Sequence, residues 1–150
     1  MRVVAQNVKS SILRIDGEIV SQIGRGVLLL VGFCKEDDES VVNMMVNKII
    51  NERVFQDDNG LTNLALNDIE GEVMSVSQFT LYADLKKGLR PSFINAKPFN
   101  EAKALYDYFN ERLKALVDSR LKLGVFGADM KIELINDGPF TIVYDSEELF

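Results

Sequence analysis

The chain has 150 residues, 47% of them hydrophobic, so a single domain spanning residues 1–150 is expected to bury its own core. Its formal net charge of −6 argues against a general nucleic-acid binder, because affinity for phosphates comes from clustered lysine and arginine. With no histidine, no clustered metal ligands and no glycine-rich phosphate loop, the sequence excludes a Ser-His-Asp triad and predicts neither a metal nor a cofactor.

Three features predict a cytoplasmic location. The single cysteine, Cys34, cannot form an internal disulfide and fits a reducing compartment. The opening stretch MRVVAQNV lacks the apolar core of a signal peptide. The apolar run at 27–33 is too short to span a membrane.

The first half of the chain predicts strands followed by a helix. The expected strands are residues 3–8, 11–15, 18–23 and 27–33. Asp16-Gly17 is a strong signal for a hairpin turn between the second and third of these. A helix of about a dozen residues should follow, capped by Asp38 or Ser40. Its apolar face is Val42, Met45, Val46, Ile49 and Ile50.

The second half predicts another helix and the remaining strands. A short strand at Val54 and Phe55 leads to a turn at 57–60 and an irregular stretch at 61–68. A strand at 72–81 precedes a long loop, 83–98, of a kind that is often functional. Asn100 is expected to cap a helix whose apolar face is Ala102, Leu105, Tyr106, Phe109, Leu113, Leu116 and Val117. Strands at 121–126, 130–136 and 140–144 complete the pattern, and the acidic tail 145–150 is expected to fray.

Together these elements predict an α+β fold. Strands joined mainly by hairpins indicate a mainly antiparallel sheet that curls into a barrel-like shape. The two helices should pack outside this sheet.

Two stretches are candidates for function, and each has a plain structural alternative. Ser77-Gln78-Phe79-Thr80 follows a buried strand, so it is either a strand leaving the core or a strand end whose amides and polar groups face a ligand. INDGPFTI at 135–142 is either a hairpin with Asp-Gly at the bend or a projecting backbone device, since Pro139 is rigid and cannot donate a hydrogen bond.

The segment from Lys86 to Lys103 departs from the acidic average, with five basic residues against one acidic residue. A solvated surface explains such a run, but so does a patch that docks a phosphate. Lys86, Lys87 and Arg90 are the candidate contacts of such a patch with a phosphate-bearing ligand.

The chain resembles the D-aminoacyl-tRNA deacylases, also called the D-tyrosyl-tRNA deacylase family. The matching segments are MRVVAQNV at 1–8, VSQFTLYAD at 76–84, GLRPSF at 88–93, EAKALYDYF at 101–109, GVFGADM at 124–130 and NDGPFT at 136–141. They follow the family's order and spacing over nearly the whole chain, and SQFTL together with NDGP is a specific pair.

The resemblance implies a homodimeric enzyme that hydrolyses the ester between a D-amino acid and tRNA and so proofreads translation. It also implies that Gly138-Pro139 has a cis bond and enters the active site of the partner subunit, where it rejects L-amino acids. Ala102 matches a pocket-lining position, although it also fits plain helix core. The family usually has an arginine where this chain has Asn7, and that arginine helps to hold the Gly-Pro loop. Either Asn7 weakens this support, or another residue such as Arg2 or Arg14 substitutes for it.

The expected catalytic residues are Ser77, Gln78, Phe79 and Thr80. Backbone N–H groups near Phe79 and Thr80 should stabilise the oxyanion formed at the 3′-terminal aminoacyl adenosine. Because no histidine is available as a base, we expect water to attack with help from the 2′-hydroxyl of the substrate, rather than a covalent route through Thr80 or Ser77. Glycyl-tRNA, which has no side chain to reject, should also be cleaved.

Two other classes of function remain open on the sequence. One is a non-catalytic module that binds RNA ends through Lys86, Lys87, Arg90 and Lys97. The other is an interaction scaffold in which both candidate stretches are merely turns. The partners expected under the main hypothesis are an aminoacyl-tRNA and a second copy of the chain, with no DNA and no membrane.

Overall fold

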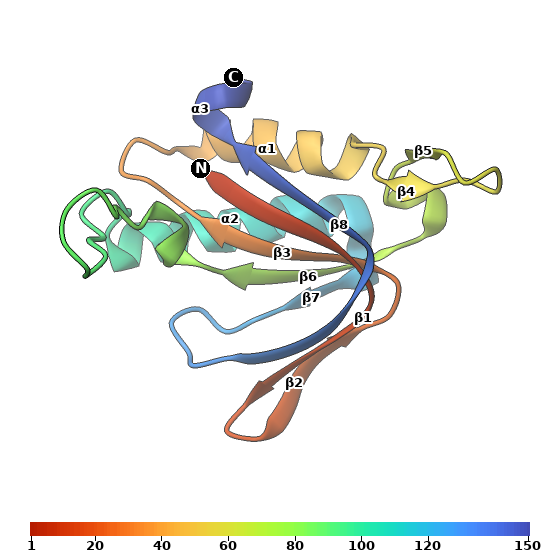
Figure 1. Cartoon of the computed structure of the whole chain (residues 1–150), viewed down its shortest axis with the longest axis horizontal. Coiled ribbons are helices and arrows are strands. Elements are labelled where there is room, and N and C mark those ends of the chain that lie inside the picture. Colours follow the sequence, from red (N-terminus) through yellow and green to blue (C-terminus); the bar gives the residue numbers. More distant parts are fainter.

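The long strand β1 (Arg2–Ile15) organises the structure, a computed structural model that describes residues 1–150. β1 pairs antiparallel with β3 (Gly26–Gly32) over its first half and with β2 (Glu18–Ile23) over its second half. On its other edge it pairs antiparallel with β8 (Lys131–Asp145). Figure 1 shows β2 and the adjoining halves of β1 and β8 curling away from the other strands. The two strands predicted at 3–8 and 11–15 are therefore one strand, and the hairpin predicted after it is confirmed.

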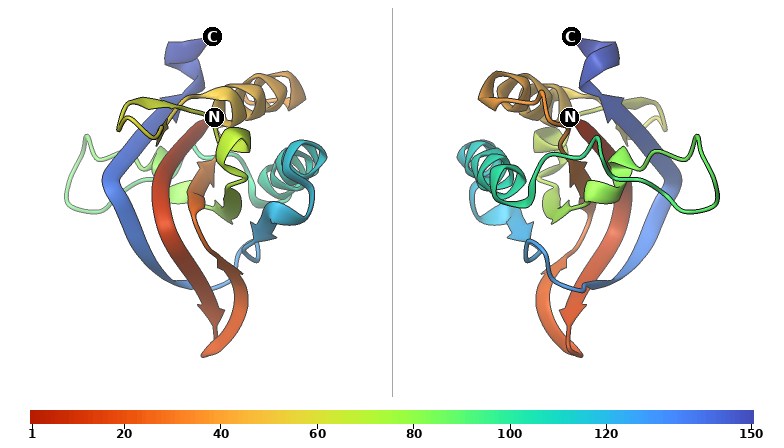
Figure 2. Two further views of the ribbon diagram at one scale, coloured as in Figure 1. Left: turned by 90° about the vertical axis from the view of Figure 1, so that its right-hand side faces the viewer. Right: turned by 90° about the vertical axis from the view of Figure 1, so that its left-hand side faces the viewer.

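The sheet is mixed, so the prediction of a mainly antiparallel sheet was wrong. β6 (Glu72–Ser77) pairs parallel with β3, and β7 (Leu121–Leu123) pairs parallel with β6, which gives the order β2-β1-β3-β6-β7 with β8 on β1. Hairpin signals mark only antiparallel neighbours along the chain, whereas parallel neighbours are joined by long crossovers through helices. The α+β class and the curled, nearly closed sheet are confirmed (Figure 2).

The contact between β3 and β6 requires a glycine at its start. A Cβ atom on Gly26 would lie 1.9 Å from the carbonyl oxygen of Glu72. Any larger residue would separate the two strands at this point. The register of β6 against β3 therefore depends on Gly26.

Helices α1 (Glu39–Asn51) and α2 (Phe99–Val117) pack against the same face of the sheet (Figure 2). The side chain of Asp38 accepts a hydrogen bond from the Val41 N–H, as predicted for a helix cap. The whole predicted apolar face of α1 is buried, and α2 buries most of its own face, although Leu116 is exposed. The main core lies between these helices and the sheet.

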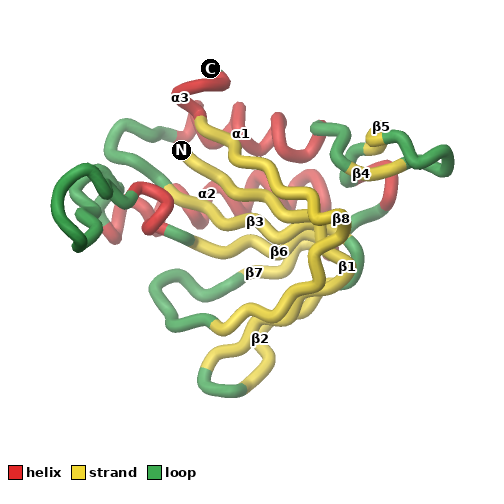
Figure 3. Tube along the Cα trace, viewed as in Figure 1, coloured by secondary structure: helices red, strands yellow, loops and turns green.

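The remaining elements are short. They are β4 (Phe55–Gln56), β5 (Thr62–Leu64), α3 (Ser146–Leu149) and the 3₁₀ helices η1 (Asn67–Ile69), η2 (Phe79–Tyr82) and η3 (Asp118–Arg120). Figure 3 shows the long loop between η2 and α2 projecting beyond the ends of β3 and β6.

Several predicted boundaries were wrong, among them that of the strand expected at 121–126, which ends at Leu123. The stretch 61–68, expected to be irregular, contains β5 and η1. The strand expected at 72–81 ends at Ser77, because the chain turns at Gln78 into η2. The N-cap of α2 is Pro98 rather than Asn100. The tail folds into α3, since the Asp145 side chain accepts a hydrogen bond from the Glu147 N–H and caps this helix.

The stretch around Gly138-Pro139 is not a hairpin. β8 continues through it, with Asn136 opposite Val8 and Thr141 opposite Gln6. Residues 137–140 have no partner in this register and form a bulge opposite Asn7. The hairpin alternative is therefore wrong, and the two strands predicted at 130–136 and 140–144 are one strand. The Gly138–Pro139 peptide bond is cis.

A buried ionic cluster joins the two ends of the chain. The Met1 ammonium group donates to Asp37 and to the Ser146 hydroxyl, and all three residues are buried. The second carboxylate oxygen of Asp37 accepts from the Cys34 N–H at 2.7 Å. Asp37 therefore satisfies two buried donors from different segments. No helix in the structure has the length and hydropathy needed to cross a membrane.

Replacing Asp37 by alanine should lower the free energy of unfolding by about 3–5 kcal/mol, because a buried positive charge loses its partner. Urea denaturation measures this change. The control is Asp107→Ala, which breaks the exposed ion pair of Asp107 with Lys103 and should change stability by no more than about 0.5 kcal/mol. Equal effects of the two substitutions would contradict the structural role of Asp37.

Candidate functional site

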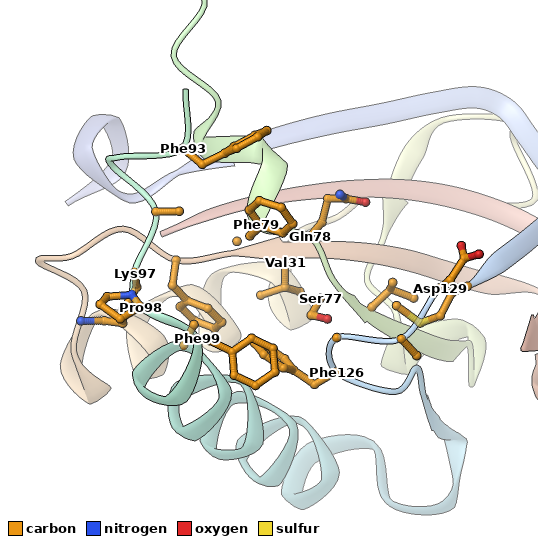
Figure 4. Close-up of a pocket in the computed structure, with 18 of the residues that line it drawn as sticks. Val31, Ser77, Gln78, Phe79, Phe93, Lys97, Pro98, Phe99, Phe126 and Asp129 are labelled. Atoms are coloured by element: carbon orange, nitrogen blue, oxygen red, sulfur yellow. The ribbon is translucent and has the colours of Figure 1, made fainter. Parts of the chain in front are cut away.

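A cavity of about 680 Å³ lies where β3 and β6 end. Most of the residues that line it are hydrophobic, and they come from five separate parts of the chain (Figure 4). The segments are 31–33, 76–79, the loop positions 93 and 96–98, the α2 positions 99 and 102, and 126–130 with 132. The carboxyl ends of two parallel strands thus open into one apolar cavity, a usual place for a ligand.

The predicted catalytic stretch forms one edge of this cavity. Ser77, Gln78 and Phe79 line it, whereas Thr80 stands just behind them and is not among the lining residues. The Gln78 N–H donates to the Val31 carbonyl at 2.6 Å, which fixes the chain at the turn out of β6. The Gln78 side-chain amide donates to the Thr80 hydroxyl at 2.6 Å. Three of the four predicted residues therefore reach the cavity, and the fourth is held by one of them.

The helix η2 begins at this edge of the cavity. Phe79 and Thr80 open the helix, and the first N–H groups of any helix lack an acceptor within it. Later in the turn, the Leu81 N–H donates to the Gln78 carbonyl and the Ala83 N–H to the Thr80 carbonyl. The turn thus leaves its first two N–H groups as candidates to bind a negatively charged oxygen.

Aromatic rings form the upper and lower walls of the cavity (Figure 4). The Phe79 and Phe93 rings meet edge to face, with centroids 4.9 Å apart. On the other side, Phe99 and Phe126 make a similar contact at 5.0 Å. Sequence reasoning missed Phe93, Phe99 and Phe126 as lining residues, because an aromatic residue in a loop or a helix face reads equally well as core.

Ala102 lines the cavity from the first turn of α2 and is 8% exposed. One turn further on, Tyr106 lies beside Phe126 and donates its hydroxyl proton to the Ser75 carbonyl at 2.8 Å. Burial raises the pKa of Tyr106, so its hydroxyl stays protonated as a donor. Tyr106 thus ties α2 to β6 directly below the cavity.

Few charged groups are present at the cavity. Lys97 and Asp129 line it, and no group of three or more histidine, cysteine, aspartate or glutamate side chains is arranged to hold a metal ion. The Lys97 side chain is 8% exposed, and its ammonium group donates to the Lys35 carbonyl at 2.6 Å. Lys97 therefore braces the loop against the β3–α1 connection and is not a free member of the basic patch.

The candidate tRNA contacts lie on the loop next to the cavity. Lys86, Lys87 and Arg90 are all exposed. The Lys86 N–H donates to the Asp84 carboxylate, which shapes the start of this loop. The loop that supplies lining residues 93 and 96–98 thus also carries three accessible positive charges.

Gly138 and Pro139 do not line the cavity of their own chain. Both are exposed on β8. Of the seven candidate residues in the catalytic and chiral-selection sets, four line the cavity: Ser77, Gln78, Phe79 and Ala102. Thr80 contacts one of these four, Gln78. Gly138 and Pro139 lie elsewhere on the surface.

Asn7, opposite the bulge, is buried and directed to another part of the fold. Its side-chain amide donates to the Val54 carbonyl at 2.6 Å. The two arginines considered as substitutes pair with Asp145 (Arg2) and Glu133 (Arg14). Neither makes a hydrogen bond to Gly138 or Pro139 within the chain.

Comparison with known proteins gives a consistent set of relatives. A family model described as D-Tyr-tRNA(Tyr) deacylase matches residues 4–145. A D-aminoacyl-tRNA deacylase of Staphylococcus haemolyticus is 47% identical over 148 residues, covering 99% of this chain and 97% of the relative. One of Limosilactobacillus reuteri (strain DSM 20016) is 51% identical over 145 residues, covering 97% and 99%.

Two solved structures share the fold. One, titled c-Myc DNA Unwinding Element Binding Protein, is 38% identical with a TM-score of 0.92 and covers 97% of this chain and 98% of its own. The other is titled as a structural analysis of a probable eukaryotic D-amino acid tRNA deacylase. It is 20% identical with a TM-score of 0.84, covers 95% and 97%, and shows likeness of fold alone.

Proposed function

The chain belongs to the D-Tyr-tRNA(Tyr) deacylase family, and from this premise we propose that it hydrolyses the ester that joins a D-amino acid to the 3′-terminal adenosine of tRNA. One domain, residues 1–150, carries out the reaction and releases free D-amino acid and tRNA. The observation that carries this proposal is the apolar cavity at the end of β6, edged by Ser77-Gln78-Phe79 at the start of η2. No cofactor or metal is required.

The oxyanion is stabilised by main-chain donors. The carbonyl oxygen of the ester sits at the start of η2, within reach of the N–H groups of Phe79 and Thr80. One such donor is typically worth about 3 kcal/mol in the transition state, because it is already oriented before charge develops. The apolar walls strengthen this interaction by excluding water.

Water is the nucleophile, assisted by the vicinal 2′-hydroxyl of the terminal ribose. A threonine nucleophile needs a neighbouring base to accept its proton. The Thr80 hydroxyl accepts a hydrogen bond from the Gln78 side-chain nitrogen, which is a donor and cannot accept a proton. This contact supports a role for Thr80 and Gln78 in shaping the turn, with Ser77 positioned beside the ester.

Selection against L-amino acids is made by Gly138 and Pro139 of a partner subunit in a homodimer. Support comes from their exposure on β8 and their absence from the cavity of their own chain. Their carbonyl groups face the amino group and α-hydrogen of a D residue, whereas an L residue directs its side chain at them. The small side chain of Ala102 leaves room in the cavity for the bound amino acid. Glycyl-tRNA passes this screen, because glycine has no side chain to clash.

Lys86, Lys87 and Arg90 attract the phosphates near the tRNA 3′ end, and the cytoplasm is where such a substrate is found. A pure RNA-end binding module is less well supported, since Lys97 is held by Lys35 and Glu101 rather than free for RNA. The net charge of −6 likewise gives no support for general DNA binding.

One assay tests the proposal: release of tyrosine from D-Tyr-tRNA and from L-Tyr-tRNA by the purified protein. Hydrolysis of the D substrate alone is expected. Equal rates on both substrates would contradict the chiral screen. Retardation of tRNA without release of amino acid would indicate a binding module, and neither effect would indicate a scaffold.

Thr80→Ala should retain substantial D-Tyr-tRNA hydrolysis, with kcat reduced by no more than about tenfold, because the main-chain donor at position 80 remains. Single-turnover kinetics measure this. Deletion of a covalent nucleophile typically costs about 10⁶-fold in kcat, so a loss of that size would reject water attack.

Gly138→Ala should abolish D-Tyr-tRNA hydrolysis. Gly138 has φ +132°, which L residues rarely adopt, and an added Cβ would lie 2.8 Å from the Phe140 nitrogen. The methyl group would also enter the tightest part of the partner's cavity. Gly60→Ala is the matched control: its φ is +77° and nothing lies within 4 Å of the added Cβ, so activity should persist.

A further inference from the structure

The guanidinium group of Arg2 connects three segments that are far apart in sequence. Its Nε donates to the Asp145 carboxylate at 2.7 Å, at the end of β8. Its Nη1 donates to the Leu81 carbonyl at 3.1 Å, in the last part of η2. Its Cζ also lies 4.7 Å from the centroid of the Tyr82 ring, a cation–π distance. The side chain therefore links the first strand, the last strand and the turn at the cavity.

We propose that Arg2 is a positioning residue for ester hydrolysis, which fixes the orientation of η2 and so aims the N–H groups of Phe79 and Thr80 at the substrate. This inference rests on the function proposed above. Arg2 is not among the residues that line the cavity, so it acts through the turn and not on the ester.

The turn needs this outside support. η2 has four residues, and a 3₁₀ helix of one turn has too few internal hydrogen bonds to hold its own direction. Its start is fixed by the bond from the Gln78 N–H to the Val31 carbonyl. The last carbonyls of a helix have no internal donor, and Arg2 supplies one to Leu81. These two hydrogen bonds lie at opposite ends of the turn and, together with the buried Tyr82 ring, define its orientation.

The Asp145 carboxylate is held in a fixed position, so it can anchor Arg2. Its other carboxylate oxygen accepts from the Glu147 N–H at 3.1 Å, and the next residue, Ser146, donates its N–H to the Met1 carbonyl at 2.9 Å. Burial on its own would raise the pKa of Asp145, but the hydrogen bonds from Arg2 and from the Glu147 N–H outweigh it and lower the pKa. The carboxylate is therefore charged at neutral pH and holds Arg2 in place.

The Tyr82 ring completes the attachment. Tyr82 is 5% exposed, so its ring is a rigid surface against which the guanidinium packs. Arginine suits this position, because a planar fork can bond Asp145 and Leu81 while it stacks on a ring. A lysine ammonium group lacks that geometry.

Loss of Arg2 should affect rate more than stability. The Arg2 side chain is 36% exposed, and ion pairs at such sites contribute little to folding. In contrast, displacement of catalytic groups by about 1 Å can reduce a rate by about 100-fold. A positioning residue thus differs measurably from a merely structural one.

The experiment compares Arg2→Gln with Arg14→Gln in D-Tyr-tRNA hydrolysis. Arg14 is the matched control, since it also pairs with a β8 carboxylate, that of Glu133, and makes no hydrogen bond or ion pair with η2. Arg2→Gln should lower kcat at least about tenfold with KM changed less than about threefold, and Arg14→Gln should leave both within about twofold. The amide NMR signals of Phe79 and Thr80 should shift in Arg2→Gln and stay unchanged in Arg14→Gln.

Two further variants keep the test decisive. Arg2→Lys, which keeps one charged contact, should give an intermediate kcat even if Arg2→Gln folds poorly. Asp145→Asn should lower kcat similarly, and the double variant should be less damaging than the product of the two single effects. Wild-type kcat in Arg2→Gln or Arg2→Lys, or equal losses in the Arg2 and Arg14 variants, would overturn the inference. Failure of the wild-type protein to cleave D-Tyr-tRNA would instead reject the proposed function.

Discussion

The pairing of β1 with three other strands is the constraint on which the rest of the fold depends. One edge of β1 is shared by β3 and then β2, and the other is occupied by β8. Because β3 is fixed in this way, β6 can align beside it in parallel, and both strands end at the same cavity. A strand of this length must also twist, which curls β2 and the far half of β8 away from the helices. Strand register therefore sets where the cavity lies, and the loops at 93–98 and 126–130 complete its walls.

The chemistry available at the cavity is mostly that of the main chain. Its walls are aromatic and aliphatic, and the one lining ammonium group, on Lys97, is occupied by a carbonyl of the β3–α1 connection. An activated ester suits such a site, because it needs a polarised carbonyl and an excluded solvent more than a strong base. The position of the main-chain donors then depends on how rigidly η2 is held. Gln78 bonds one end of η2 to Val31, and Arg2 bonds the Leu81 carbonyl at the other end.

Features that depend on residues close together in the sequence were predicted well. Strand pairings between residues far apart in the sequence were predicted poorly. The period of the apolar residues in α1, its Asp38 cap and the Asp16-Gly17 turn are local features, and each was confirmed. The parallel pairing of β3 with β6 and the continuity of β8 depend on residues far apart, so hairpin reasoning misassigned both. The same holds at the site. Ser77, Gln78 and Phe79 stood out because polar residues follow a buried strand. Phe93 and Phe126 did not, because only the assembled fold shows that they face the same space.

The bulge in β8 also affects how readily another strand can pair with the free edge of the sheet. β8 is a long strand with one edge unpaired within the chain, and such an edge is a template on which unfolded or foreign strands can add. Residues 137–140 break the regular row of donors and acceptors midway, and Pro139 offers no N–H at all. An incoming chain therefore cannot extend a continuous ladder along this edge. The irregularity at Gly138 and Pro139 is therefore of the kind that limits strand addition along an exposed sheet edge.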